Sequence, residues 1–364
     1  MSEEDKPIEK KKCYNGYNDF FEKMSNITPQ QRVGIFTHRS PDPDALASMM
    51  GMAWLLQKKF SLESDLFYEG EIAHPQNQVM SNLLAINLKK VSDEYNDSLY
   101  GVKILVDTIP ENAGVGKNQI VFDIVIDHHR DLPSQYCGIM IHRRTGSCSS
   151  IIFDMMKHFV EKEDWFDTES ADDCRVATAL ITGIVTDTEY MMSDDSTDME
   201  FKAFQELFPF RNPSFLKEIV FFKRQKYWIE KMAKASVEVE IDDNGLAIVG
   251  LGIIPEKQRD LISEMAQYMV SWASVETAIA FAVVGGDKIQ GSVRSLDASL
   301  TISDVCKKLA GKHGTGGGKL GKGAYKLPLA GFSIDPDEEL EDIEEAWASI
   351  KKREIKRIQR QFSA

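Results

Sequence analysis

The organisation of this chain follows from residues 32–53, which read RVGIFTHRSPDPDALASMMGMA. The first six of these residues form a short apolar run that predicts a buried strand ending at Thr37. Apolar residues then recur at helical spacing, i, i+3, i+4 and i+7, and they are Leu46, Met49, Met50 and Ala53. This spacing predicts an amphipathic helix that packs one face against a core.

The loop between this strand and helix contains one imidazole and two carboxylates, from His38, Asp42 and Asp44. An Asp ahead of an apolar helix is a common N-cap, because its carboxylate accepts hydrogen bonds from unpaired N–H groups. A cap explains one carboxylate but does not require His38, and two prolines stiffen the loop. A plain helix cap and a metal site are both open interpretations of this loop.

The same alternation continues along the chain. Residues 103–106 and 120–126 are apolar runs that predict further strands, and residues 148–160 and 171–185 have the pattern of helices. Strands that alternate with helices indicate an α/β fold with a mostly parallel sheet. In such sheets the reactive side chains lie beyond the carboxyl ends of the strands.

Acidic and imidazole side chains stand at these strand and helix ends. Asp107 ends one predicted strand, the next ends in Asp127, His128 and His129, and Asp187 ends a later apolar run. So many close carboxylates repel one another unless cations are bound. Carboxylate and imidazole ligands suit manganese, with magnesium, cobalt or iron as substitutes. Two such ions about 3.5–4 Å apart form a clamp for in-line phosphoryl displacement.

Composition excludes several classes of protein. The chain has 364 residues, enough for two domains, and a net charge of −14, which argues against coating duplex DNA by charge. Its five cysteines show no C-x-x-C spacing, so we expect a reducing cytoplasm rather than a disulfide scaffold. No run approaches 18 apolar residues and the N-terminus lacks an apolar core, so we expect neither a membrane span nor a signal peptide.

The second half of the chain changes character. Residues 214–234 are charged and amphipathic, and we expect one connecting helix there. A second unit follows, with Tyr268 and Trp272 on one face of a predicted helix and with residues 307–326 containing seven glycines and six lysines but no acid. That stretch fits either a flexible surface loop or a cradle for phosphate. The tail has an acidic block followed by a basic one, as expected for a solvated helix.

The motif order His-x-x-x-Asp-x-Asp, strand-end Asp, Asp-His-His and Thr-Asp-Thr resembles that of the DHH phosphoesterase superfamily. The resemblance implies a mostly parallel DHH domain and a smaller α/β substrate-binding domain joined by a helical linker. The implied boundaries are an N-terminal arm at 1–30, the DHH domain at 31–213, the linker helix at 214–235, the DHH-associated domain at 236–334 and a charged helix at 335–364.

The same resemblance implies roles for individual residues. It implies that each chain binds two Mn²⁺ ions, with Mg²⁺ or Co²⁺ as substitutes, and that Asp107 bridges the two ions. The implied ligands are His38, Asp42, Asp44, Asp107, His128 and Asp187. Asp127 would orient His128, and His129 would face the substrate phosphate as the second catalytic residue. In the second domain the family has a Ser-x-Arg strand and a glycine run, which implies a substrate-binding set of Ser292, Arg294, His313, Gly316, Gly317, Gly318 and Lys319. The family usually has His after the glycine run, where this chain has Lys319.

These expectations lead to a function. We expect a manganese-dependent hydrolase of short oligonucleotides or linear dinucleotides, resembling nanoRNases, that also accepts 3′-phosphoadenosine 5′-phosphate. The alternative is a cyclic di-AMP phosphodiesterase. A family II pyrophosphatase is disfavoured because its Ser-Arg-Lys-Lys segment is missing, and an inert regulator because all six ligands are present. The expected partner is short RNA or a dinucleotide, and we expect no binding to duplex DNA or to a membrane. Whether the chain forms a homodimer is left open by the sequence.

Overall fold

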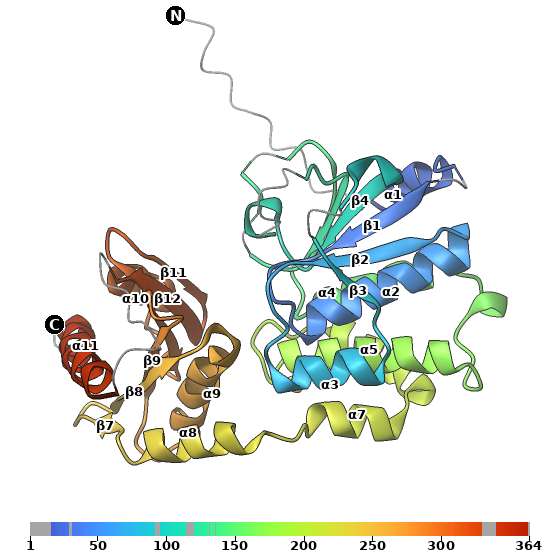
Figure 1. Ribbon diagram of the computed structural model, residues 1–364. Helices are drawn as coiled ribbons and strands as arrows, with labels where there is room; N and C mark the ends of the chain where they lie inside the picture. Colours follow the sequence, from blue (N-terminus) through green and yellow to red (C-terminus); the bar gives the residue numbers. More distant parts are fainter. Residues whose placement is uncertain are drawn as a thin grey trace, which may run out of the picture. The chain divides into compact units, whose positions relative to one another are not determined.

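The computed structural model describes residues 16–28, 31–91, 95–113, 120–130, 132–134, 136–329 and 340–362. The chain forms two compact units that divide between Lys223 and Arg224 (Figure 1). The first unit contains α1 (Tyr17–Ser25), β1 (Arg32–Phe36), α2 (Pro43–Phe60), β2 (Ser64–Tyr68), α3 (Pro75–Leu83), β3 (Leu88–Lys90), β4 (Tyr100–Val106), β5 (Ile124–Asp127), β6 (Ile139–His142), α4 (Cys148–Phe159), α5 (Ala171–Asp187), α6 (Asp198–Leu207) and α7 (Pro213–Val220).

The sheet of the first unit has six strands in the order β3-β2-β1-β4-β5-β6. All of its strand pairs are parallel, which confirms the predicted α/β class. The strand order reverses direction between β1 and β4, and a crevice forms beyond the carboxyl ends at such a switch point. The loops after β1, β4 and β5 therefore converge on one edge of the sheet.

The helices of this unit cover mainly one face of the sheet. In Figure 1, α2, α4 and α5 lie on the same side of β1, β2 and β4. Val33, Ile35 and Ile104 point from the strands into the core with these helices, and Phe36 and Leu105 point to a smaller cluster on the opposite face. This alternation is what a period of two along each strand produces.

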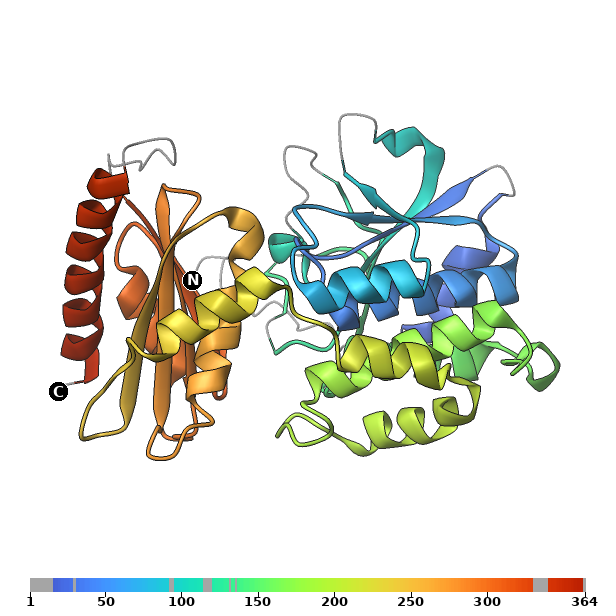
Figure 2. The ribbon, with the colours of Figure 1, turned by 60° about the horizontal axis from the view of Figure 1, so that its bottom comes forward.

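The second unit is built on a mixed sheet. It contains α8 (Lys226–Ser236), β7 (Glu240–Ile241), β8 (Leu246–Ile254), α9 (Asp260–Met269), β9 (Thr277–Val284), β10 (Lys288–Ser295), α10 (Ile302–Ala310), β11 (Thr315–Lys319), β12 (Lys322–Pro328) and α11 (Leu340–Phe362). The strand order is β11-β12-β10-β9-β8-β7, with β8 and β9 parallel and the other pairs antiparallel. Ala280 points to the face covered by α8 and α9, and Phe281 to the face with α10 and α11 (Figure 2).

The structure corrects the single connecting helix expected at 214–235. The segment forms two helices, α7 and α8, separated by residues 221–225. Ile219 is buried in the core of the first unit and Trp228 in the core of the second. Because the two halves of the segment pack in different cores, no single amphipathic face runs through it.

The glycine-rich stretch is also more ordered than expected. Residues 315–319 are strand β11 of a hairpin with β12, rather than a surface loop. A Cβ atom at Gly316 would overlap the backbone of Cys306 on α10, so glycine permits this close packing. Gly317 has open space around its would-be Cβ, so packing does not explain that glycine.

Smaller differences concern helix and strand limits. The strand predicted at 120–126 begins only at Ile124. Tyr268 is half exposed, whereas Trp272, which follows the end of α9, is partly buried and packs against the core of the second unit. Residues 1–15 and 29–30 of the predicted N-terminal arm lie outside the described residues. The same holds for residues 330–339, where the predicted charged helix begins, and for residues 363–364. Among the described helices, none is long and apolar enough to cross a membrane.

Candidate metal centre

Three strand ends meet at the switch point of the first sheet. His38 follows β1, Asp107 follows β4 and His128 follows β5. Nε2 of His38 lies 3.6 Å from Oδ2 of Asp107, and Nε2 of His128 lies 3.4 Å from Oδ1 of Asp107. The carboxylate of Asp107 therefore faces His38 with one oxygen and His128 with the other, and Nδ1 of His129 lies 4.0 Å from the second of these oxygens.

Two further carboxylates and the end of α5 complete the cluster. Asp42 has Oδ1 3.9 Å from Nε2 of His38. Nε2 of His128 lies 3.9 Å from Oδ2 of Asp44 and 3.3 Å from Oδ2 of Asp187. The structure thus brings together all six residues predicted as ligands, although they come from four separate segments.

Asp107 occupies an unusual backbone conformation. Its φ angle is 59°, in the left-handed region. This region is uncommon for residues other than glycine, and Asp tolerates it better than most. The N–H of Asp107 donates to the carbonyl of Ile126 on the neighbouring strand at 2.9 Å, and the Thr37 hydroxyl donates to the carbonyl of Val106 at 3.0 Å. These bonds hold the carboxylate between β1 and β5.

Asp44 is fixed by the N-terminus of α4. Its Oδ2 accepts a hydrogen bond from the N–H of Cys148 at 2.7 Å, and its Oδ1 accepts from the N–H of Ser149 at 2.9 Å and from the Ser149 hydroxyl. Gly183 of α5 passes so close that a Cβ there would lie 2.9 Å from Oδ1 of Asp44. Unpaired N–H groups at a helix start stabilise an anion, so these hydrogen bonds offset part of the cost of burying the Asp44 carboxylate.

The two adjacent histidines have different partners. Nδ1 of His128 donates to the carbonyl oxygen of Thr145 at 2.9 Å, which leaves Nε2 facing the carboxylates. Nδ1 of His129 lies 2.8 Å from Oδ1 of Asp127, which is fully buried. The expectation that Asp127 orients His128 is therefore wrong: Asp127 orients His129, because the ring of His128 is turned toward Thr145.

Negative charge dominates the electrostatics of the cluster. Burial, and next the charge of Asp107, raise the pKa of Asp44 well above its usual range. Burial would raise the pKa of Asp107, but the neighbouring His128 and His38 hold it far below its usual value. Burial would lower the pKa of His128, yet the same carboxylates raise it to about 10. The carboxylates therefore favour positive charge on the His128 imidazole.

These side chains fit divalent metal ions. Among the described residues, three groups have ligand atoms within 4.8 Å of one another: His38, Asp42 and Asp107; Asp107, His128 and His129; and Asp44, His128 and Asp187. Buried atoms without a hydrogen-bond partner include Oδ1 of Asp107 and Nε2 of His128. Unpartnered buried polar atoms are costly, and a cation between them would satisfy both.

Glu200 of α6 lies close to the centre but was not predicted. It is fully buried, and its carboxylate accepts hydrogen bonds from the segment that carries Thr145. The only signal in the sequence is the Thr197-x-x-Glu200 spacing of a capping box, which is present. That signal predicts the start of a helix and says nothing about the metal centre.

The predicted substrate residues all belong to the second unit. Nη1 of Arg294 donates to the Ser292 hydroxyl at 3.0 Å, and its Nε donates to Oε1 of Gln267 at 3.0 Å. Ser292 is itself buried, so the structure assigns it to holding Arg294. Arg294 pairs with Lys322 across β10 and β12, and Lys322 pairs with Lys319 across β12 and β11.

Directly paired residues of adjacent strands point to the same face. Arg294, Lys322 and Lys319 therefore form a row of three cations on one face of the sheet. His313 lies exposed in the turn before β11 and does not belong to this row. Gly316, Gly317 and Gly318 precede Lys319 in the edge strand.

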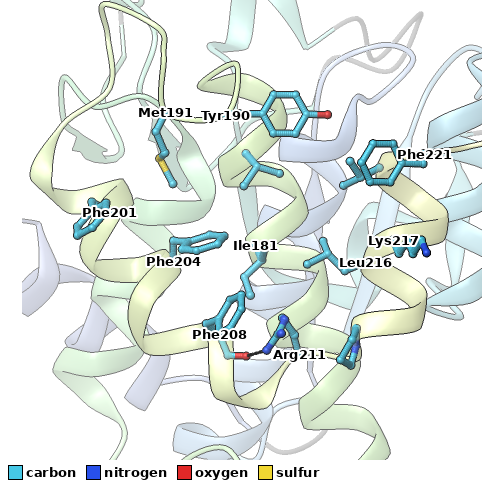
Figure 3. Close-up of a pocket in the computed structure, with 13 residues that line it drawn as sticks. Ile181, Tyr190, Met191, Phe201, Phe204, Phe208, Arg211, Leu216, Lys217 and Phe221 are labelled. Carbon is cyan, nitrogen blue, oxygen red and sulfur yellow. Dashed lines mark hydrogen bonds between the residues drawn. The ribbon is translucent and has the colours of Figure 1, made fainter.

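A second hollow of the first unit has a different character. It has a volume of about 490 Å³ and lies between α5, α6 and α7. Figure 3 shows Phe201 and Phe204 on one side, Leu216 on the other and Ile181 of α5 between them. None of its thirteen lining residues is an acid or a histidine, so this hollow is not a metal site.

Comparisons with known proteins agree with this geometry. Residues 32–184 match the family model described as DHH family, N-terminal domain. An uncharacterized protein of Methanocaldococcus jannaschii is 29% identical over 307 residues, covering 84% of this chain and 60% of that protein. A probable manganese-dependent inorganic pyrophosphatase of Lactobacillus delbrueckii is 21% identical over 175 residues, covering 48% of this chain and 53% of that protein. The matches thus span less than two thirds of these two relatives.

A third relative is matched over most of its length. The probable bifunctional oligoribonuclease and PAP phosphatase NrnA of Streptococcus mutans is 26% identical over 324 residues, covering 84% of this chain and 93% of that protein. Among solved structures, an exopolyphosphatase-related protein from Bacteroides fragilis has a TM-score of 0.67 at 16% identity, covering 95% of this chain and 98% of that chain. At this identity the similarity shows a shared fold.

Proposed function

From the premise that residues 32–184 form a DHH-family N-terminal domain, we propose that this protein is a manganese-dependent phosphodiesterase that hydrolyses short oligoribonucleotides or linear dinucleotides. The observation that carries the proposal is the carboxylate of Asp107, whose two oxygens face His38 and His128 separately. A bridging carboxylate of this kind suits two metal ions side by side. Two adjacent ions clamp the attacking and leaving oxygens of a phosphoryl group.

Each ion would have its own set of ligands. His38, Asp42 and Asp107 would hold one, and Asp44, His128 and Asp187 would hold the other together with Asp107. Bound divalent cations supply Lewis acidity to the phosphoryl group. The protein contributes ligands held in place before binding: Asp44 by the start of α4 and His128 by the carbonyl of Thr145.

His129 is suited to handle a proton. Its Nδ1–H donates to the buried carboxylate of Asp127, which fixes the ring and leaves Nε2 for another partner. A His held by a carboxylate in this way can deliver a proton to a leaving oxygen. We assign this role to His129, with Asp127 as its positioning residue.

The second unit would bind substrate phosphate. The row formed by Arg294, Lys322 and Lys319 places a planar guanidinium beside two point charges. Ser292 and Gln267 hold Arg294 in one orientation. This pre-organisation supports recognition of a terminal phosphate and so favours linear substrates such as pApA. Gly316, Gly317, Gly318 and His313 stay in the proposed substrate-binding set.

The similarity to NrnA supports a nanoRNase-like activity and, with it, hydrolysis of 3′-phosphoadenosine 5′-phosphate. The similarity to a probable manganese-dependent pyrophosphatase makes pyrophosphate a second candidate substrate. We also propose that the protein is located in the cytoplasm and that its partner is short RNA or a dinucleotide. The five cysteines show no C-x-x-C spacing, which supports a reducing compartment. Light scattering would test whether the chain forms a homodimer.

A substrate panel tests the proposal. Catalytic efficiency would be measured with Mn²⁺ on pApA, ApA, cyclic di-AMP, 3′-phosphoadenosine 5′-phosphate and pyrophosphate. We expect pApA to be the best substrate, followed by ApA. If cyclic di-AMP or pyrophosphate is hydrolysed most efficiently, the substrate assignment is wrong. Equal activity in excess chelator would contradict the metal dependence.

A further inference from the structure

The side chain of Glu200 is a fully buried carboxylate with every oxygen engaged. Its Oε1 accepts hydrogen bonds from the Thr145 hydroxyl, from the N–H of Gly146 at 3.0 Å and from the Ser150 hydroxyl at 2.5 Å. Its Oε2 accepts from the N–H of Thr197 at 2.8 Å and from the Thr197 hydroxyl at 2.7 Å. Five donors on one carboxylate exceed what a helix cap requires.

Three of these donors belong to one segment, residues 145–150, and that segment touches the metal centre at two places. The carbonyl of Thr145 accepts from Nδ1 of His128 at 2.9 Å. The N–H groups of Cys148 and Ser149 donate to Asp44 at 2.7 and 2.9 Å. A single segment therefore orients two of the predicted ligands, and Glu200 anchors that segment.

The fit between Glu200 and the segment is tight. A Cβ atom at Gly146 would lie 2.6 Å from the Thr188 side chain and 3.3 Å from the carboxyl carbon of Glu200. Glycine lets the backbone approach α6 and the end of α5 at the same point. Because the space is filled, a change at Glu200 would be transmitted to Thr145 rather than absorbed.

We propose that Glu200 is a positioning residue of the metal centre, which acts on His128 through Thr145 and on Asp44 through the start of α4. The inference rests on the proposed metal centre but not on the identity of its substrate. Partners that orient metal ligands typically change metal affinity about 10–100-fold when they are mutated. Glu200 would do so without touching metal or substrate.

The isosteric variant Glu200→Gln separates this role from simple packing. An amide keeps the volume, but its NH₂ group must face either the N–H of Gly146 or the N–H of Thr197. Neither backbone donor can turn to accept, so one side of the network is broken. Thr145→Val provides a second test, because it removes only the hydroxyl that Glu200 holds and leaves the Thr145 carbonyl in the chain.

The experiment measures the ring nitrogens of His128 by ¹⁵N NMR of the full-length, metal-free protein, together with Mn²⁺ affinity by calorimetry. Glu206→Gln is the matched control, since Glu206 lies on the same helix, is exposed and pairs only with Lys157 among the described residues. We expect Glu200→Gln and Thr145→Val to shift the His128 resonances and to weaken Mn²⁺ binding about 10–100-fold. The resonances of His74, a histidine at the start of α3, should stay unchanged in both variants. The control variant Glu206→Gln should keep the wild-type His128 resonances and Mn²⁺ affinity.

Two outcomes would overturn the inference. In one, folded Glu200→Gln keeps the His128 spectrum and the Mn²⁺ affinity of the wild type. In the other, its melting temperature falls but the folded fraction binds Mn²⁺ normally, which makes Glu200 only a structural residue. The proposed function can fail separately. If the wild type hydrolyses no nucleotide but the two variants still shift the His128 resonances and weaken Mn²⁺ binding, the inference is supported and the proposed function is rejected.

Discussion

The carboxylate of Asp44 accepts a hydrogen bond from the N–H of Cys148, 104 positions later in the chain. This bond joins the start of α2 to the start of α4, and both helices follow loops that lie at the carboxyl edge of the sheet. The start of α4 donates to both oxygens of Asp44, and Oδ2, which accepts only the N–H of Cys148, keeps a lone pair for a cation. Asp44 is thus both a tie between two helices and a candidate ligand.

Asp107→Asn tests the bridge. The amide keeps the shape but removes the charge shared by the two ligand groups, so we expect less than one Mn²⁺ per chain and loss of turnover by about three orders of magnitude or more. Metal analysis of the purified protein and assays on pApA provide the measurement. Asp243→Asn, at an exposed loop position, is the control. Wild-type metal content in Asp107→Asn would contradict a bridging role.

Arg294→Ala tests the phosphate-binding row. Removing a charge-assisted contact of about 1.5–3 kcal/mol should lower catalytic efficiency on pApA by about 10–100-fold. Mn²⁺ content should be unchanged, and a small activated ester such as bis-p-nitrophenyl phosphate should be affected less. The remaining activity should also depend less on salt. An equal loss on both substrates would place Arg294 in the catalytic centre or the fold.

Gly316→Ala and Gly317→Ala separate packing from binding in β11. The Cβ at 316 would overlap the backbone of Cys306, whereas the Cβ at 317 meets no atom within 4 Å. We expect Gly316→Ala to lower the melting temperature and Gly317→Ala to leave it unchanged. If the strand cradles phosphate through its backbone, Gly317→Ala should still raise KM for pApA. An unchanged KM would leave the glycine run without a binding role.

Asp65→Asn tests a carboxylate far from any predicted ligand. Burial would raise the pKa of Asp65, but hydrogen bonds from Arg32, Lys89 and Tyr100 lower it. A lowered native pKa stabilises the fold above the unfolded value, near pH 4. Denaturant unfolding should show a loss of about 2–3 kcal/mol in Asp65→Asn at pH 7. The difference should shrink as the pH falls below 4, and a constant difference from pH 7 to 3 would contradict the charge-based explanation.

Glu354→Ala tests how α11 is held against the second sheet. Glu354 is buried, accepts from the Tyr325 hydroxyl at 2.6 Å and pairs with Arg357 at 2.6 Å. Removing it leaves the Tyr325 hydroxyl without its acceptor and Arg357 without its carboxylate, at a cost of about 3 kcal/mol. The unfolding midpoint should fall, while Mn²⁺ affinity, which belongs to the first unit, should be retained. Glu345→Ala, at an exposed position of the same helix, is the control.

Sequence patterns were sufficient for the class of fold and for grouping the acidic and imidazole side chains of the candidate metal centre, whereas the individual ligand roles came from the resemblance to the DHH family. Apolar runs followed by Asp or His predict strand ends, and the carboxyl ends of parallel strands always meet at one edge. For this reason His38, Asp107 and His128 could be grouped without any structure. Boundaries were less reliable, as the break at 221–225 shows, because burial in two different cores leaves no trace in local spacing.

Contacts between distant segments could be decided only by the tertiary structure. Nothing near Asp127 in the sequence distinguishes His128 from His129 as its partner; the position of the Thr145 carbonyl, seventeen residues beyond His128, makes that choice. Glu200 has the spacing of an ordinary capping box, and only the folding of 145–150 against α6 gives it three further donors. The sequence determines which chemical groups are present and, through the spacing of its apolar residues, which segments form helices and strands. The orientation of each polar group depends on backbone partners in distant segments, which local patterns do not encode.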